Sequence, residues 1–325
     1  MALSTTAAPP ASVPTRDDDP GKRRSRWLGR FDLKVSPYLY VAPFFIIFGV
    51  FGAYPMFRTL YMSFFDWDLV NDRIEGHTFI GLDNYVRMFG EEYYWNAVRN
   101  TFAIFLIATV PQLLLALFLA NLLNRQLRAK TFWRMSVLVP NAASVAAVAI
   151  IFGTLYQRDF GVINWALEQL GLPRIDWHAS VWAQWTAIAT MVDWRWTGYN
   201  TLILLAGMQA IPRDIYESAS LDGAGQWRQF WSVTFPMLRP TFLFVTIVSI
   251  SGGLQLFTEP VIFNNGYNVL GGTLRQSQTV TMYMWENSME QTHNAGYGAA
   301  VSWSLFVMIL LAALANYLLV RRSTR

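Results

Sequence analysis

The sequence predicts an all-α, polytopic membrane protein in which six helices cross the bilayer and both termini lie in the cytoplasm. Its composition is the first reason, because 54% of the 325 residues are hydrophobic and only 14% are charged. An average soluble domain carries about 25% charged residues. The charges also gather in short patches between long apolar stretches. The placement of Lys and Arg then sets the orientation.

Six apolar stretches are long enough to span, since a transmembrane helix needs about 20 mostly apolar residues. Five of them contain no Asp, Glu, Lys or Arg: Val35 to Phe57, Asn100 to Asn124, Met135 to Gln157, Pro240 to Thr258 and Asn294 to Val320. The sixth, Trp177 to Ala210, contains Asp193 and Arg195, and we interpret it as one long helix with two charges towards one end. Buried helices of a soluble core are the alternative, but six such stretches in one chain argue against it.

Lys and Arg are retained on the cytoplasmic side of membrane proteins. The tail up to Lys34, the loop 125–134, the loop 213–239 and the C-terminal tail hold seven, four, three and three of the 25 Lys and Arg residues. Both termini are therefore predicted to be cytoplasmic. The connection Asp66 to Glu92 carries seven acids and is expected outside.

The membrane domain is predicted to cover residues 35–320, between two cytoplasmic tails. Residues 1–34 are interpreted as a disordered basic tail, and residues 321–325 as a short second tail. The first segment is not expected to be a cleaved signal peptide, because the first apolar run is long enough to span. Its basic cluster, Lys22 to Arg26, is expected to contact anionic membrane lipid, and no nucleic acid is expected as a partner.

The composition also limits the chemistry. The chain has no cysteine, and its three histidines (His77, His178 and His293) lie far apart in sequence. No disulfide, metal site or bound cofactor is therefore predicted. No nucleophile motif or other catalytic constellation is evident, and the sequence lacks the Gly-x-x-x-x-Gly-Lys-Ser/Thr phosphate loop of ATPases. The chain is therefore expected to be a non-enzyme that draws energy from another polypeptide.

One cytoplasmic loop, residues 211–239, stands out from the others. Pro212 suits the first turn of a helix, and Asp214 and Glu217 follow where the helix dipole favours acids. The small residues Ser218 to Ser220 would allow close approach to another surface. Gly223 and Gly225 permit a sharp turn before a second short helix. The pattern predicts a helix, a glycine turn and a helix lying along the membrane.

This loop resembles the "EAA" loop of binding-protein-dependent ABC importer permeases. The family pattern is Glu-Ala-Ala, three residues, Gly, nine residues, Ile, one residue and Leu-Pro. This chain has Glu217-Ser218-Ala219, then Gly223, then Val233-Thr234-Phe235-Pro236 at the same spacings. It departs from the pattern at Ser218, Val233 and Phe235, all mild changes of size. The resemblance implies the type I ABC importer permease fold.

The resemblance also implies a mechanism and a set of partners. The loop would form a coupling helix seated in a cleft of a separate ATPase subunit, which binds ATP and Mg. The residues implied at this contact are Glu217, Ser218, Ala219, Asp222, Gly223 and Ala224. The implied assembly contains this permease, a second homologous permease, two ATPase subunits and an extracytoplasmic sugar-binding protein. Its location would be the bacterial cytoplasmic membrane.

Further segments resemble sugar-uptake permeases of the maltose and glycerol-phosphate type. They include Tyr54-Pro55, Phe79 to Tyr85 and Leu205 to Pro212, and the resemblance extends over residues 36–320. It implies import of a di- or oligosaccharide, with a weaker similarity to permeases for cellobiose-like β-glucosides. One alternative is glycerol-phosphate, although a phosphate ligand would favour several buried arginines. Another is a gradient-driven secondary transporter, which would leave the loop 211–239 unexplained.

A sugar pathway needs aromatic faces and hydrogen-bonding groups inside the spans. The candidates are Trp185, Trp194, Arg195, Tyr199, Asn200, Gln255, Phe257 and Glu259. Ionisable groups in membrane segments usually face the protein interior or water. At 1.5 Å per residue, Arg195 and Glu259 both lie near the outer side of the bilayer. We predict that they pair and face a shared cavity. The alternatives are unpaired interfacial charges, and aromatic residues that serve packing or a lipid belt.

Overall fold

Helices form nearly all of the computed structural model, which describes residues 35–68, 70, 76–125, 127–264, 270–272, 274–290 and 293–322. The all-α prediction is confirmed there. The predicted tail 1–34 lies outside the described residues, as do residues 323–325 of the second tail. The chain divides into two units, Met1–Arg58 and Thr59–Arg325. In the first unit the described chain belongs to the helix Val35–Met62, which includes η1 (Gly49–Ala53) and α2 (Tyr54–Met62).

A small ribbon and a short helix precede the first long helix of the second unit. Strand β1 (Phe65–Asp66) pairs antiparallel with β2 (Thr78–Phe79), with Phe65 opposite Phe79. Helix α4 (Asp83–Gly90) follows, and Asn84 on it donates to the carbonyl oxygens of Ser63 and Phe65, each at 3.0 Å. This side chain fixes the ribbon to α4. Helix α5 (Glu92–Asn124) begins two residues after α4 ends.

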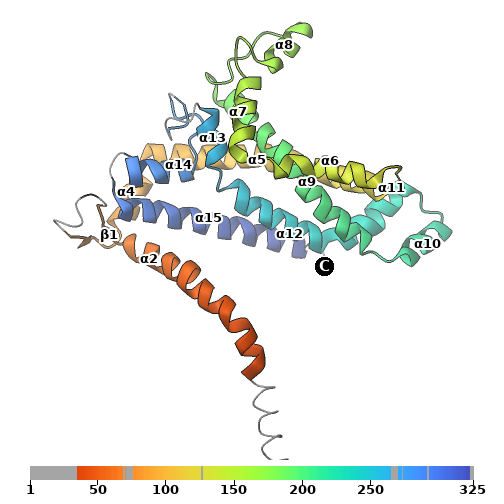
Figure 1. Ribbon diagram of the computed structural model, residues 1–325, viewed down its shortest axis with the longest axis horizontal. Helices are drawn as coiled ribbons and strands as arrows, with labels where there is room; N and C mark the ends of the chain where they lie inside the picture. The colour runs from red at the N-terminus through yellow and green to blue at the C-terminus, as the bar shows by residue number, and fades with distance from the viewer. Residues whose placement is uncertain are drawn as a thin grey trace, which may run out of the picture. The chain divides into compact units, whose positions relative to one another are not determined.

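The remaining helices run through the rest of the second unit (Figure 1). In chain order they are α6 (Lys130–Ala142), α7 (Val145–Leu155), α8 (Val162–Gln169), α9 (Val181–Gln209), α10 (Arg213–Leu221), α11 (Gln226–Gln229), η2 (Phe230–Thr234), α12 (Phe235–Gly253), α13 (Thr258–Phe263), α14 (Val280–Trp285), η3 (Glu286–Glu290) and α15 (Ala295–Arg322). The π-helical turn η2 joins α11 to α12 without a break, so these three elements form one helix, Gln226–Gly253.

Four helices in the described part of the chain are long and apolar enough to cross a membrane: Val35–Met62, Glu92–Asn124, Gln226–Gly253 and Ala295–Val320. The bent pair α6–α7 supplies a fifth if it counts as one span. Helix α9 is 29 residues long, but its polar and Trp residues keep it out of this set. The six-span topology and the cytoplasmic position of both termini stay predictions.

The stretch Met135 to Gln157, predicted as one span, is bent. Helices α6 and α7 meet at 91°, because Ala143 and Ser144 between them adopt extended backbone angles. Pro140 lies just before this break, where its ring and missing N–H weaken the helix. An uncharged apolar run gives no sign of such a break. The prediction that Met135 to Gln157 forms one helix is therefore wrong, because two helices at 91° cover this stretch. Helix α7 then packs against α13.

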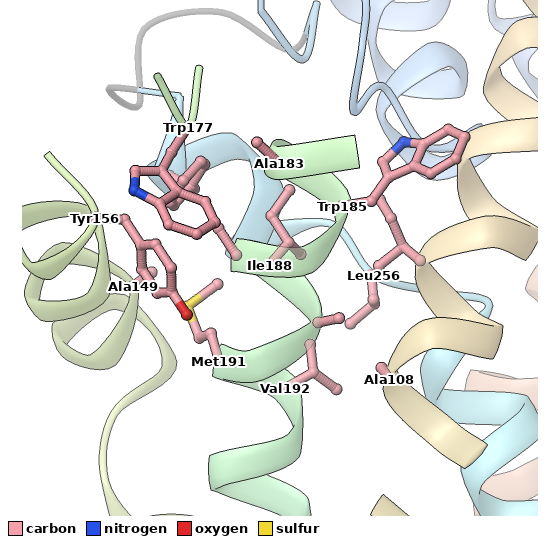
Figure 2. Packing of buried hydrophobic residues seen from close by; sticks show 14 of the residues in the cluster. Ala108, Ala149, Tyr156, Trp177, Ala183, Trp185, Ile188, Met191, Val192 and Leu256 are labelled. Carbon is pink, nitrogen blue, oxygen red and sulfur yellow. The ribbon is translucent and has the colours of Figure 1, made fainter. Parts of the chain in front are cut away.

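Helix α9 is the central element of the second unit. It packs against α5, α6, α7, α12 and α13, and buried side chains lie along its whole length. Figure 2 shows Ile188, Met191 and Val192 of α9 in a hydrophobic cluster with Ala108 of α5 and Tyr156 beyond α7. A helix surrounded in this way can carry polar residues that lipid would not tolerate.

We predict that Gly198→Ala weakens the fold, because α9 and α6 cross at this glycine. A Cβ atom at residue 198 would lie 1.7 Å from the carbonyl oxygen of Val137, and small residues permit such close helix contacts. Overpacking of this kind typically costs about 1–3 kcal/mol. The measurement is the midpoint of thermal unfolding in detergent.

Gly153→Ala in α7 is the matched control, since nothing lies within 4 Å of a Cβ atom built there. We expect its unfolding midpoint to equal or exceed that of the unmodified protein. Equal midpoints for the two variants would show that the crossing of α6 and α9 is looser than the structure indicates.

Candidate functional site

The segment 213–229 forms the predicted helix, glycine turn and helix. Helix α10 ends in a turn in which the N–H of Gly223 donates to the carbonyl of Ser220 at 3.0 Å and the N–H of Ala224 donates to that of Ala219 at 2.9 Å. This pair of bonds is the Schellman motif, which needs a left-handed residue after the helix. Gly223 supplies it with φ +76°. Gly223 is therefore needed at this position because it adopts the left-handed backbone conformation that ends α10.

Side-chain contacts hold α10 to the helix that follows it. Gln229 donates from Nε2 to Oγ of Ser220 and to the carbonyl of Ala224, both at 2.9 Å. The hydroxyls of Tyr216 and Thr234 are hydrogen-bonded at 2.9 Å. Because α11 continues through η2 into α12, the turn is attached to a candidate span. A displacement of α10 would therefore be passed on to α12.

The six residues implied at the ATPase contact lie together on this element. Glu217, Ser218, Asp222 and Gly223 are exposed, whereas Ala219 and Ala224 are half-buried. The structure adds two residues that the sequence analysis missed, because Leu221 is 90% exposed and Trp227 is 75% exposed. Exposed apolar side chains of this kind mark interaction surfaces. A Leu and a Trp close to a glycine turn were the available signal in the sequence.

Arg195 and Glu259 form a buried ion pair, as predicted. Nη1 of Arg195 on α9 lies 3.0 Å from Oε1 of Glu259 on α13, and each side chain is 8% exposed. The alternative of unpaired interfacial charges is therefore wrong. A cavity of about 20 Å³ between α5, α9 and α12 is lined by residues that include Gln112, Trp196 and Ser249, and by neither member of the pair. The predicted shared cavity stays a prediction.

The other six predicted pathway residues do not converge on one site. Asn200 joins α9 to α12 through a 3.1 Å hydrogen bond to Ser249. Trp185 lies in the hydrophobic core (Figure 2) and donates from Nε1 to the carbonyl of Gln276 at 2.9 Å. It therefore packs the core of the second unit.

The remaining four pathway candidates make local contacts. The ring of Trp194 lies 5.8 Å from that of Phe152, Tyr199 packs edge-on to Trp196, and Phe257 packs on Trp285. Gln255 is exposed and bonds to Ser251 one turn earlier. The structure thus places these residues apart from the buried ion pair, and their role in a sugar pathway stays a prediction.

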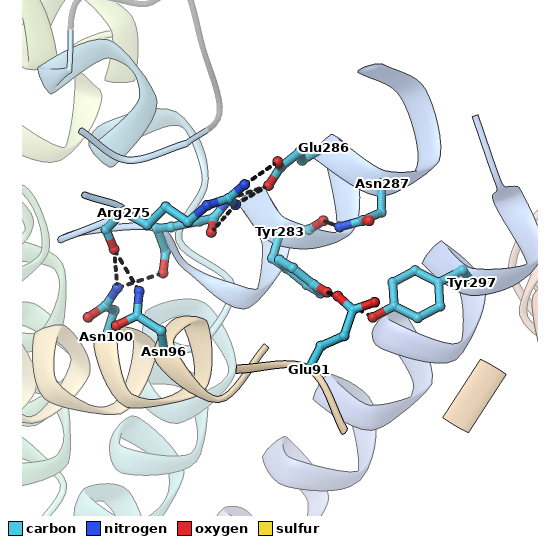
Figure 3. Close-up of polar contacts among 9 residues, drawn as sticks. Glu91, Asn96, Asn100, Arg275, Tyr283, Glu286, Asn287 and Tyr297 are labelled. Carbon is cyan, nitrogen blue, oxygen red and sulfur yellow. Dashed lines mark hydrogen bonds and ion pairs between the residues drawn. The ribbon is translucent and has the colours of Figure 1, made fainter. Parts of the chain in front are cut away.

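A polar network at the opposite end of the bundle from α10 holds the segment between α13 and α14 (Figure 3). Arg275 donates from Nη2 to Oε1 of Glu286 at 2.7 Å, and Gln278 donates to the same carboxylate at 2.6 Å. Asn96 and Asn100 of α5 donate to the carbonyl of Arg275 at 2.9 and 2.8 Å. The segment is therefore fixed to the start of α5.

Glu91 ties α14 and α4 to the same network. Its carboxylate accepts hydrogen bonds from the hydroxyl of Tyr283 and, at 2.8 Å, from Nε of Arg87. Burial alone would raise the pKa of Glu91, but these two hydrogen bonds, the positive charge of Arg87 and the nearby hydroxyl of Tyr297 together hold the pKa below its ordinary value. Sequence analysis missed this network, because Glu91 and Tyr283 are too far apart in sequence for any local pattern to join them.

Residues 98–325 match a protein family described as "Binding-protein-dependent transport system inner membrane component". The lactose transport system permease protein LacF of Rhizobium radiobacter is 34% identical over 288 residues, which cover 87% of this chain and 92% of that protein. The arabinooligosaccharides transport system permease protein AraP of Bacillus subtilis is 30% identical over 300 residues, covering 90% and 91%. Full-length similarity of this kind shows common ancestry.

The fold is similar to that of a solved transporter subunit. A chain in the crystal structure of a bacterial alginate ABC transporter, in complex with alginate pentasaccharide-bound periplasmic protein, superposes with a TM-score of 0.72. The match covers 92% of this chain and 99% of that chain at 20% sequence identity. At this identity the likeness establishes the fold.

We predict that Arg195 and Glu259 depend on each other. Removing one partner of a buried ion pair typically costs about 3–5 kcal/mol, because the other charge is left unpaired. Arg195→Glu and Glu259→Arg should therefore each lower the yield of folded protein from membranes, whereas the double exchange should recover much of it. The measurement is monodisperse yield by size-exclusion chromatography. A double variant no better than either single one would contradict the pairing.

We also predict that Gly223→Ala loosens the end of α10. A left-handed conformation costs a residue with a side chain roughly 1–2 kcal/mol, so the amide hydrogens of Gly223 and Ala224 should exchange roughly five- to thirtyfold faster. Peptide-level hydrogen exchange over residues 213–229 measures this.

Gly225→Ala serves as the control, because Gly225 has φ −67° and open space around a built Cβ atom. Equal acceleration in both variants would mean that the turn geometry at Gly223 is not the cause.

Proposed function

Because the chain belongs to the family of binding-protein-dependent transport system inner membrane components, we propose that it is the pathway-forming subunit of an ATP-driven importer of a di- or oligosaccharide. It is a multi-pass membrane protein and a transport component, not an enzyme. Relatives along nearly its full length are named as permeases for lactose and for arabinooligosaccharides. Their names support a sugar substrate.

The α10–turn–α11 element carries the proposal. It presents Leu221 and Trp227 to solvent beside the motif residues Glu217 and Gly223, and this surface suits a second protein. Since the sequence lacks a phosphate loop, we assign ATP and Mg to a separate ATPase docked there. A second homologous permease, a second ATPase and an extracytoplasmic sugar-binding protein would complete the importer.

The contacts suggest how ATPase movement would reach the membrane helices. A push on α10 would pass through Gln229 and the Tyr216–Thr234 hydrogen bond into the helix Gln226–Gly253. Its α12 portion packs against α5, α9 and α15. Rocking of α12 against these three helices would then change access to the polar groups between them.

The ion pair favours a neutral sugar over glycerol-phosphate. Arg195 is the arginine among the predicted pathway residues, and it is already neutralised by Glu259 at 3.0 Å. A phosphate group would have to displace that carboxylate and leave it buried and unpaired, which is costly. Hydroxyl groups of a sugar need hydrogen-bond partners rather than net positive charge.

The proposed function predicts ATP hydrolysis that is stimulated by one sugar. This chain would be reconstituted in proteoliposomes with its co-encoded permease, ATPase and binding protein, and phosphate release would be measured across a panel of mono- and disaccharides. We expect stimulation by a disaccharide and its loss in Glu217→Lys, because the added charge would disrupt the ATPase contact. Ser218→Ala is the control, since it restores the family's alanine and should keep the stimulation.

Two outcomes would contradict the proposal in different ways. An intact complex that no sugar stimulates would move the substrate to another class of solute while keeping the ATPase coupling. Sugar uptake that persists without the ATPase and collapses when ion gradients are dissipated would instead establish a secondary transporter.

A further inference from the structure

Two adjoining cavities lie between the end of α5, the start of α6 and the α10–turn–α11 element. One has a volume of about 560 Å³ and the other about 420 Å³, and small-molecule sites typically occupy about 300–1,000 Å³. Asn124, Tyr216 and Gln229 line both cavities, so the two meet at these side chains. Together they form one cleft, which we call the α5–α10 cleft.

The larger cavity concentrates positive charge. Lys130, Arg134 and Arg213 line it, and no Asp or Glu is among the described residues that line either cavity. None of these three cations belongs to an ion pair of the described chain. The acids of α10 closest to Arg213 in sequence, Asp214 and Glu217, are exposed and line neither cavity. The cleft therefore lacks a counter-ion within the part of the chain that the structure describes.

Arg134 has the greatest need of an anion. Its Nε and Nη2 are buried and have no hydrogen-bond acceptor among the described residues. A buried guanidinium that no carboxylate neutralises is costly. Lys130 lies one helical turn before it on α6, on the same side of the helix. A phosphate monoester carries about 1.5–2 negative charges at neutral pH, so it matches such a group of cations better than a single carboxylate does.

The smaller cavity adds neutral polar groups and aromatic rings. Its lining includes the amides of Asn121, Asn124, Gln226 and Gln229, the hydroxyls of Tyr216 and Thr234, and the rings of Trp227 and Phe230. Each amide can both donate and accept hydrogen bonds, which is what sugar hydroxyls require. The cleft thus has a cationic part and a part suited to a neutral polyhydroxyl group.

We infer that the α5–α10 cleft binds a phosphorylated sugar, with its phosphate near Lys130, Arg134 and Arg213 and its sugar ring near Asn121. Arg213 and Tyr216 belong to α10, whereas Asn121 belongs to α5. The ligand would therefore hold α10 against the ends of α5 and α6. Its consequence for transport rests on the proposed function: restraint of α10 would slow coupled ATP hydrolysis. The binding itself requires no ATPase.

The test separates the phosphate from the sugar. The full-length chain, purified in detergent without the ATPase, is titrated with glucose 6-phosphate, glucose, inorganic phosphate and AMP in a calorimeter. We expect glucose 6-phosphate to bind roughly tenfold or more tightly than the other three, because glucose and inorganic phosphate each lack half of the contacts and AMP carries a flat base in place of hydroxyls. Bound glucose 6-phosphate should also slow hydrogen exchange over residues 213–229.

Two variants address the two parts of the cleft. Arg134→Gln should weaken glucose 6-phosphate and inorganic phosphate alike, by roughly tenfold, since a hydrogen bond to a charged group is lost. Asn121→Ala should weaken glucose 6-phosphate and leave inorganic phosphate unchanged. Arg128→Gln is the matched control, because Arg128 is exposed and is not among the described residues that line either cavity.

Several outcomes would overturn the inference. Equal affinity for glucose would remove the phosphate, equal affinity for inorganic phosphate would remove the sugar, and tighter binding of AMP would assign the cleft to nucleotides. Should Arg134→Gln fail to fold, Arg213→Gln removes a cleft cation at an exposed position and should weaken binding in the same way. Equal loss in Arg128→Gln would show that the effect is not specific to the cleft. Because the titration involves neither ATPase nor transport, its failure would leave the proposed function standing.

Discussion

The hydrocarbon core of a membrane supplies no partner for a charged side chain. The packing of the helices around α9 follows from the need to bury the charges of that helix within the protein. Helix α9 carries Asp193 and Arg195 as well as several uncharged polar residues, so lipid is a costly environment for it. It lies instead among α5, α6, α7, α12 and α13. The carboxylate that neutralises Arg195 is Glu259 on α13, which places that short helix against α9. Helix α7, bent away from α6 by 91°, then packs on α13.

This central position of α9 links the two ends of the bundle mechanically. Its last residues lead into α10, and its middle part bonds to α12 through Asn200 and Ser249. Helix α12 is itself the continuation of the turn that holds α10. A movement of α10 would therefore reach the buried polar centre by two routes, along α9 and along α12. The ion pair would resist separation of α9 from α13, so such a movement would be a rigid rocking rather than a local unfolding.

Local patterns in the sequence predicted some of these features well. The helix–glycine–helix turn was predictable because its cause is local: Gly223 adopts a conformation that other residues avoid. The pairing of Arg195 with Glu259 was predictable because a buried charge needs an opposite partner. The predicted span Pro240 to Thr258 ends earlier than expected, however, since α12 stops at Gly253 and Glu259 lies on the separate helix α13. The bend at Ala143–Ser144 was not, since hydropathy records polarity and not backbone direction. A sequence cannot distinguish a tryptophan that packs a core from one that stacks on a sugar, and the structure places Trp185 in the core, so its role in a pathway stays a prediction. The hydrogen bond between Glu91 and Tyr283 joins distant segments, and no local pattern encodes such a contact.

The two ends of the second unit differ in what their side chains contact. At the end with α4 and α14, Arg275, Glu286, Gln278 and Glu91 bond to one another or to tyrosines, and the backbone of the connecting segment is held by asparagines of α5. At the other end Arg134 has buried donors without acceptors, and Leu221 and Trp227 face solvent. Exposed apolar side chains of this kind mark interaction surfaces. The turn between α10 and α11 is therefore where we propose that a separate ATPase docks. Because α11 continues into α12, a protein bound at this turn would act directly on one of the candidate spans.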